Sequence, residues 1–258
     1  MQKWLITFSG AAYDDSTEQT VLRGPGLGAD EVYVYDDVWL AQHEFSRLPA
    51  NRWIFDHHGD EHGIKRGICW FAWKPLVMLD ALSKIEDGGI VLYIDGDTGP
   101  IADFSVLYRE CDRTGGIMLF TAAGCSNRQW VKYDCRAVMG FPCAPDTQHA
   151  VARFYLFQKG SWRTQQFLYE WLTYCLNPLA TTFDPSILGP EIEGFQQHRT
   201  EQAILTLLSY KYGIRLYREA CQFGEAMPDD RELYPQLFEQ TYGAGPRDVA
   251  GSKFRRIP

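Results

Sequence analysis

The Asp-Gly-Asp turn at residues 95–97 is the sequence feature that most constrains the fold. It follows the apolar run Ile90–Ile94, which is typical of a strand buried on both faces of a parallel sheet. A helix is predicted over Lys74–Ile85, because its apolar residues recur at helical spacing and the glycines of Glu86–Gly89 can end it. This order is that of a βαβ unit, so we expect an α/β fold with ligands beyond the carboxyl ends of the strands.

Strands and helices are predicted along most of the chain. The pattern predicts strands at Trp4–Phe8, Glu31–Tyr35, Ile117–Thr121 and Ala152–Phe157, and helices at Trp162–Cys175 and Thr200–Tyr212. No internal repeat interrupts them. A length of 258 residues fits one large domain, and we expect a flexible C-terminal tail over residues 243–258.

Composition narrows the possible partners. A net charge of -8 disfavours a broad nucleic-acid-binding face, so duplex nucleic acid is an unfavoured partner, although a local basic patch stays compatible with it. The seven cysteines are odd in number and never spaced as C-x-x-C, which favours reduced thiols in a cytoplasmic protein. No stretch approaches the about 20 apolar residues of a membrane span. The eight Trp, 14 Tyr and 15 Phe fit either a large core or a groove that stacks sugars or bases.

Asp95 and Asp97 are candidate ligands for a divalent cation. Mn²⁺ and Mg²⁺ prefer oxygen ligands and often share their coordination with substrate phosphates. Gly96 lets the backbone come close to a ligand. The alternative is a polar turn with two solvated aspartates, which is common for a D-x-D pattern outside this context.

Four stretches, taken in order, resemble GT-A-fold nucleotide-sugar glycosyltransferases. They are Cys69–Leu76, Gly89–Asp97, Asn127–Cys135 and His198–Leu205, the last two being similar to uncharacterised bacterial and viral members. The resemblance spans about residues 3 to 215. It implies a single-domain, Rossmann-like GT-A fold over residues 1–242, with a mostly parallel central sheet flanked by helices.

The resemblance also implies a reaction and a division of the domain. The expected reaction moves a sugar from a UDP- or GDP-linked donor to an acceptor hydroxyl on a saccharide or other molecule. Residues 1–100 would form the nucleotide- and metal-binding half, and residues 101–242 the acceptor half. Acceptor, donor sugar and stereochemistry stay open.

Donor contacts implied by the resemblance fall mainly at the ends of the first two strands. Thr7, Phe8, Ser9 and Gly10 would hold the nucleoside, and Asp36 would lie near the base or ribose. An ordinary strand-to-helix turn is the alternative for this loop.

Four further residues are expected at the donor. Lys74 precedes the metal-binding strand, Asp95 and Gln202 would face the donor, and Lys253 could fold over the diphosphate. For Lys74 and Lys253 the alternatives are a solvated helix start and a solvated basic tail.

Two carboxylates are candidates for the chemical step. Glu201 would take the proton of the acceptor hydroxyl if the enzyme inverts, or stabilise the oxocarbenium-like centre if it retains, and Asp134 is the second candidate. The alternatives are a dipole-stabilised carboxylate in the first turn of a helix for Glu201 and a solvated loop residue for Asp134. Many GT-A enzymes use a late histidine as third metal ligand, and here that ligand is His198, a late aspartate such as Asp248, or absent.

Two other functions are compatible with parts of the sequence. The Asp56-His57-His58 cluster resembles a metal motif of DHH phosphoesterases, but in those enzymes it follows the D-x-D element, whereas here it precedes it. A non-catalytic carbohydrate- or nucleotide-binding module would not need both Asp97 and Glu201. A glycosyltransferase is therefore the favoured interpretation.

Overall fold

The computed structural model describes residues 1–9, 14–56, 68–140, 145–226 and 236–240. The strands are β1 (Lys3–Ser9), β2 (Glu31–Asp36), β3 (Ile90–Asp95), β4 (Thr98–Pro100), β5 (Ile117–Ser126), β6 (Gln148–Gln158), β7 (Leu216–Tyr217) and β8 (Phe238–Gln240). The helices are α1 (Asp14–Arg23), α2 (Asp37–Gln42), α3 (Glu44–Arg47), α4 (Arg52–Phe55), α5 (Trp73–Lys84), α6 (Ser105–Arg113), α7 (Asn127–Trp130), α8 (Tyr133–Met139), α9 (Trp162–Cys175), α10 (Pro178–Thr181) and α11 (Thr200–Lys211). Every strand and helix range predicted above overlaps one of these elements.

The main sheet has six strands in the order β2-β1-β3-β6-β5-β7. The pairs β1–β2, β1–β3 and β5–β7 are parallel, whereas β6 runs antiparallel to both β3 and β5. The expected α/β fold with a mostly parallel sheet is confirmed. Because β1–β3 come from residues 1–100 and β5–β7 from residues 101–242, the two expected halves of the domain share one sheet.

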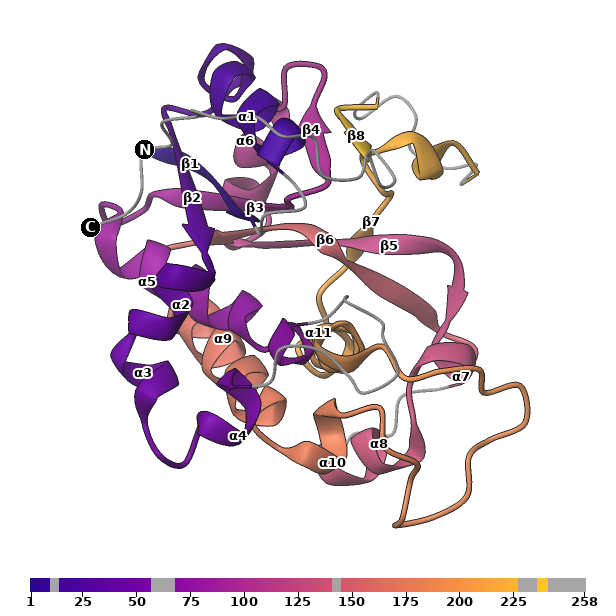
Figure 1. The fold of residues 1–258 in the computed structure, drawn as a ribbon. Helices are drawn as coiled ribbons and strands as arrows, with labels where there is room; N and C mark the ends of the chain where they lie inside the picture. Colours follow the sequence, from indigo (N-terminus) through magenta and orange to yellow (C-terminus); the bar gives the residue numbers. More distant parts are fainter. Residues whose placement is uncertain (10–13, 57–67, 141–144, 227–235, 241–258) are drawn as a thin grey trace.

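Helices cover both faces of this sheet (Figure 1). The faces alternate along β3, where Val91 and Tyr93 join one core cluster and Leu92 and Ile94 join the other. The first cluster packs against α5, α9 and α11, and the second against α6. A strand buried on both faces needs apolar residues at every position, which explains the unbroken run in the sequence.

A second sheet of two strands lies beside the Asp-Gly-Asp turn. β4 follows the turn directly and pairs antiparallel with β8, so that Thr98 lies opposite Gln240. Phe238 anchors β8, because it is fully buried and packs on the rings of Phe104 and Phe154 at 5.6 and 5.7 Å. The sequence pattern does not reveal this pairing, which brings the end of the described chain back to the turn.

Two global properties agree with the composition. Within the described residues, no helix combines the length and hydrophobicity needed to cross a lipid bilayer. The six cysteines placed by the structure are all free thiols.

We predict that Phe238→Ala lowers the free energy of unfolding by about 3–5 kcal/mol, because a buried ring is replaced by a cavity. Glu239→Ala is the matched control, since Glu239 is exposed in the same strand, and it should change stability by less than about 0.5 kcal/mol. Urea denaturation of the three proteins checks both values. Equal stabilities would show that β8 does not contribute to the packed core.

Candidate functional site

Asp95 is the last residue of β3, and it faces the helices α5 and α11. Its Oδ1 accepts hydrogen bonds from the Tyr93 hydroxyl at 2.7 Å and from the Lys74 ammonium at 2.8 Å. The Asp95 side chain is 29% exposed, so it is held by the protein on one side and open to solvent on the other. This placement fits a ligand-binding carboxylate at the carboxyl end of a strand.

Lys74 connects the turn to the rest of the site. Its ammonium lies 2.8 Å from Asp95 Oδ1, 3.4 Å from Glu201 Oε1 and 2.8 Å from the backbone oxygen of Ala152. These three acceptors match the three protons of an ammonium group. Burial opposes the charge, but the two carboxylates outweigh it and raise the pKa of Lys74. Lys74 is therefore a charged residue inside the protein and is only 3% exposed. The alternative of a solvated lysine at a helix start is wrong.

Aromatic rings enclose the Lys74 ammonium. The ring centroids of Phe71, Trp73 and Tyr93 lie 5.0, 5.8 and 5.5 Å from its nitrogen, within the range of cation–π attraction. Phe71 ends a turn in which three consecutive residues, 69–71, have φ angles of 56°, 45° and 59°. Left-handed conformations cost about 1–2 kcal/mol per residue for L-amino acids, so the fold stores strain next to this ion cluster.

Glu201 lies in the first turn of α11 and is buried. Its Oε1 faces Lys74, and its Oε2 accepts a hydrogen bond from the Thr200 hydroxyl at 2.6 Å. Thr200 itself has a positive φ of 41°. Burial raises the pKa of Glu201, while the Lys74 charge works in the opposite direction. Because both carboxylate oxygens are engaged and the side chain is 4% exposed, Glu201 is not open to an acceptor in this arrangement.

Asp97 is held by a residue of β8 and by its own neighbour in β4. Its Oδ2 accepts a hydrogen bond from the Gln240 amide at 2.8 Å, and its Oδ1 one from the Thr98 hydroxyl at 3.1 Å. Burial and the neighbouring negative charge of Asp95 raise the pKa of Asp97. The side-chain carbonyl oxygen of Gln240 in turn accepts a hydrogen bond from the Arg153 guanidinium. Arg153 also forms an ion pair with Glu219 at 3.2 Å.

Asp95 and Asp97 have the chemistry of a partial metal site. With Glu201 and Lys74, their ionised forms carry a net charge of -2, three carboxylates against one ammonium. A divalent cation would balance this charge and remove the repulsion between the two aspartates. In the part of the chain that the structure describes, no third His, Cys, Asp or Glu joins them in a metal-binding group. The two carboxylates therefore fit a cation that takes its other ligands from water and substrate phosphates.

The residues expected around the nucleoside lie at the ends of β1 and β2. Phe8 stacks on Trp73 with centroids 4.0 Å apart, and Ser9 Oγ accepts from Thr17 at 3.2 Å. Thr7 is buried, and its hydroxyl has no partner among the described residues. Asp36 caps α2 by accepting a hydrogen bond from the backbone N–H of residue 39 at 2.7 Å. Register places Phe8 opposite Asp95 and Ser9 opposite Asp36.

Gln202 and His198 are held by backbone groups. The Gln202 amide donates to the Ala150 oxygen at 2.9 Å. His198 Nδ1 accepts from the Lys132 N–H at 3.3 Å, and Nε2 donates to the Ala180 oxygen at 2.7 Å. Both ring nitrogens of His198 are thus engaged, and no lone pair is left for the metal that was expected there. Burial lowers the pKa of His198 to about 3.

Asp134 lies in α8 and is fully buried. The alternative of a solvated loop residue is therefore wrong. Its carboxylate oxygens accept the backbone N–H groups of Ile187 and Leu188 at 2.9 and 2.8 Å. Its own N–H donates to the Ser186 hydroxyl at 3.2 Å. This pattern is that of a carboxylate that fixes a loop, and it does not place Asp134 at the acceptor hydroxyl.

Several expected residues lie outside the described residues. They are Gly10, the His57-His58 part of the phosphoesterase-like cluster, Asp248 and Lys253. Asp56 is described, and it forms an exposed ion pair with Arg52 at 3.6 Å.

The comparisons with known proteins concern the fold. No known protein-family profile and no curated protein matches the sequence. Among solved structures, the apo form of mouse xyloside xylosyltransferase 1 matches with a TM-score of 0.52 at 11% identity, over 96% of this chain and 99% of that chain. The apo structure of WbbM, a bifunctional glycosyltransferase, matches with a TM-score of 0.51 at 10% identity, over 95% of this chain and 46% of that chain. The chain shares its fold with these glycosyltransferases.

We predict that Lys74→Met lowers the free energy of unfolding by about 3–5 kcal/mol, because two carboxylates lose a buried partner. The double variant Lys74→Met/Glu201→Gln should recover part of that loss, since it removes one unpaired charge. Lys84→Met is the control, because Lys84 forms a more exposed pair with Asp80 and should cost less than about 1 kcal/mol. Denaturant unfolding of all four proteins tests the coupling. A Lys74→Met variant as stable as the control would contradict it.

We also predict a loss of stability in acid from two buried histidines. Burial lowers the pKa values of His149 and His198 to about 3 from their usual value near 6.5. The unfolded state therefore binds more protons below about pH 6.5, and stability falls from there toward pH 3. His198→Gln should reduce the slope of the unfolding free energy against pH between pH 6 and 4. The reduction should be at most the slope that corresponds to the uptake of one proton on unfolding. An unchanged slope would mean that His198 is not buried in its neutral form.

Proposed function

We propose that this chain transfers a sugar from a UDP- or GDP-linked donor to an acceptor hydroxyl, with Mn²⁺ or Mg²⁺ held by Asp95 and Asp97. The observation that supports this most is the pair of close carboxylates at the end of β3, where the charge of Asp95 helps to raise the pKa of Asp97. A donor diphosphate with a divalent cation is a ligand suited to such a site. The fold, shared with sugar-transferring enzymes, is compatible with the same reaction.

Asp95 and Asp97 would contact the cation, and Lys74 would act as a positioning residue. When bound, the cation would offset the negative charge that develops on the leaving diphosphate. Lys74 fixes one oxygen of Asp95, and Glu201 completes the set of acceptors around Lys74. We therefore revise the role of Glu201 from proton acceptor to electrostatic support, because its carboxylate is buried and engaged.

The nucleoside would bind beyond the carboxyl ends of β1 and β2, next to Ser9 and Asp36. These strand ends adjoin the end of β3 in the same sheet, so one ligand could reach both the aspartates and this region. The unpaired Thr7 hydroxyl supports a polar ligand or water near the end of β1. A contact of Lys253 with the diphosphate stays a prediction.

We predict that Asp97→Asn abolishes transfer while leaving the metal-free protein at least as stable as wild type. Loss of an electrostatic contact to the leaving group should reduce the rate by about 10²–10³-fold or more. The pKa of Asp97 is raised in the folded protein, so ionised Asp97 weakens the fold above its unfolded pKa of about 4, and a neutral amide removes that cost. Asp87→Asn, at a side chain 89% exposed, is the charge-matched control.

Thermal melting with UDP or GDP, with and without Mn²⁺, gives the first readout. Wild type and Asp87→Asn should be stabilised by nucleotide plus Mn²⁺, and Asp97→Asn should not. Stabilisation of Asp97→Asn equal to wild type would show that the cation site is elsewhere. Stabilisation by the metal alone together with phosphate release from simple esters would support the phosphoesterase instead.

A further inference from the structure

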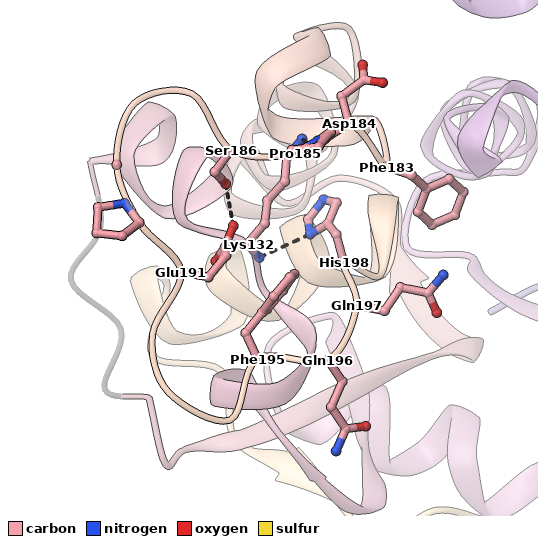
Figure 2. A pocket seen from close by; sticks show the side chains of 12 residues that line it. Lys132, Phe183, Asp184, Pro185, Ser186, Glu191, Phe195, Gln196, Gln197 and His198 are labelled. Atoms are coloured by element: carbon pink, nitrogen blue, oxygen red, sulfur yellow. Dashed lines mark hydrogen bonds between the residues drawn. The ribbon is translucent and has the colours of Figure 1, made fainter.

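Arg199 is an exposed cation whose backbone is fixed on both sides. Its neighbours His198 and Thr200 are 2% and 3% exposed, and Figure 2 shows the His198 ring bonded to the backbone N–H of Lys132. The N–H of Arg199 donates to the backbone oxygen of Trp130 in α7 at 3.1 Å. The Arg199 side chain itself is exposed to solvent. The fold thus fixes the Cα atom of an arginine whose charge lies at the surface.

The indole of Trp130 holds the guanidinium group of Arg199. The guanidinium carbon lies 4.2 Å from the ring centroid, within the range of cation–π attraction. Arginine on an aromatic face keeps N–H groups that can form two parallel hydrogen bonds with a carboxylate or phosphate. Among the described residues, none forms an ion pair or hydrogen bond with these N–H groups. By contrast, Arg128 of the same helix pairs with Asp146 at 2.7 Å.

The side chains near Arg199 do not neutralise its charge. That charge acts on the protonation of His149 and Cys125, so both lie close to it. Burial, together with Arg199, lowers the pKa of His149 to about 3. Burial also raises the pKa of the Cys125 thiol, although Arg199 works in the opposite direction. Both side chains are therefore neutral at pH 7, and the uncompensated cation attracts a negatively charged ligand.

A buried acceptor in the same region also lacks a partner. Asn127 and Trp130 are three residues apart in α7, so they are neighbours on that helix. The Oδ1 atom of Asn127 lies 2.9 Å from His149 Nδ1, which must carry the proton and donate it. Nε2 of His149 is then an acceptor, and it is buried without a partner among the described residues. Buried acceptors are almost always satisfied, so this one indicates a bound water or a ligand group near Arg199.

The strand β6 links the surroundings of Arg199 to the candidate site. It is antiparallel to β3, and its residues 148–153 lie beyond the stretch that pairs with β3, on the way to α7 (Figure 1). The backbone oxygen of Ala152 binds Lys74 of the ion cluster, and three residues earlier on the same strand His149 reaches α7. At about 3.3 Å per residue, this separation is about 10 Å along the strand. A ligand bound beyond the end of β3 can therefore extend to Arg199.

We propose that Arg199, held on Trp130, binds an anionic group of the acceptor, either a carboxylate or a phosphate. The inference rests on the proposed function for the word acceptor, whereas binding of the anion can be tested without donor or transfer. It goes beyond that function by assigning a charge to the acceptor. The alternative is a surface arginine that has only water as its partner, and the experiment decides between the two.

The test compares the dissociation constants of methyl glucuronide, glucose 6-phosphate and the neutral methyl glucoside. They are measured by saturation-transfer NMR titration on the full chain without nucleotide. Wild type should bind at least one of the acidic sugars about tenfold more tightly than methyl glucoside, as a charge-assisted hydrogen bond predicts. Arg199→Gln should reduce this preference to about twofold or less. The two acidic probes distinguish a carboxylate from a phosphate.

Two further variants separate a specific contact from a general effect of charge. Arg47→Gln is the charge-matched control, because Arg47 is exposed at the end of α3, far from α7 (Figure 1), and it should keep the preference of wild type. Arg199→Lys keeps the charge without the planar pair of donors, so it should keep only part of the preference. Both side chains are exposed, so all variants should fold, which thermal melting checks.

Two results would overturn the anion site. One is a wild type that binds neither acidic sugar more tightly than methyl glucoside, and the other is an acid preference that survives in Arg199→Gln. The proposed function fails separately, when UDP and GDP with Mn²⁺ do not stabilise wild type. An acid preference that depends on Arg199, in a protein that binds no nucleotide, would keep the anion site and remove the transferase.

Discussion

The buried ammonium of Lys74 is the interaction on which the candidate site depends. It joins α5, β3, β6 and α11, because its three acceptors come from the last three of these elements. A charge in the interior is tolerable only when every proton has an acceptor, so the positions of Asp95 and Glu201 are mutually determined. The Asp95 carboxylate at the end of β3 is thereby oriented before any ligand arrives. Preorganisation of this kind is what electrostatic catalysis requires.

The sequence predicted the framework of this arrangement well. The unbroken apolar run before Asp95 specifies a strand buried on both faces, and helical spacing after Lys74 specifies the helix that precedes it. Parallel strands then place Asp95, Phe8 and Asp36 along one edge. The sequence pattern does not show which side chains of different helices and strands point toward one another. The contact between Lys74 and Glu201 joins residues 127 positions apart, and the sequence predicted that both would be near a donor, not that they would bind each other.

The roles of Asp134 and His198 changed for the same physical reason. The resemblance made Asp134 a candidate for the chemical step and His198 a candidate metal ligand, yet both side chains bond backbone groups of residues 182–199 or of the elements beside them. Gln240 shows the opposite case, since a glutamine near the end of the described chain carries no motif. Only the β4–β8 pairing brings its amide to Asp97. The contact between Asp97 and Gln240 could therefore be anticipated only from the tertiary structure.

The left-handed turn at residues 69–71 and the positive φ of Thr200 flank Lys74 and Glu201 on their two helices. Glycine adopts such conformations at a lower backbone cost, because it has no Cβ, but Cys69 is fully buried and the side chains of Trp70 and Phe71 pack against the core. Glycine at these positions would relieve about 1–2 kcal/mol of backbone strain per residue and would lose side-chain packing that stabilises the fold by a similar or larger amount. The strained turn is therefore held by the packing of its own side chains, and the core, not local backbone preference, sets the direction in which α5 enters the ion cluster.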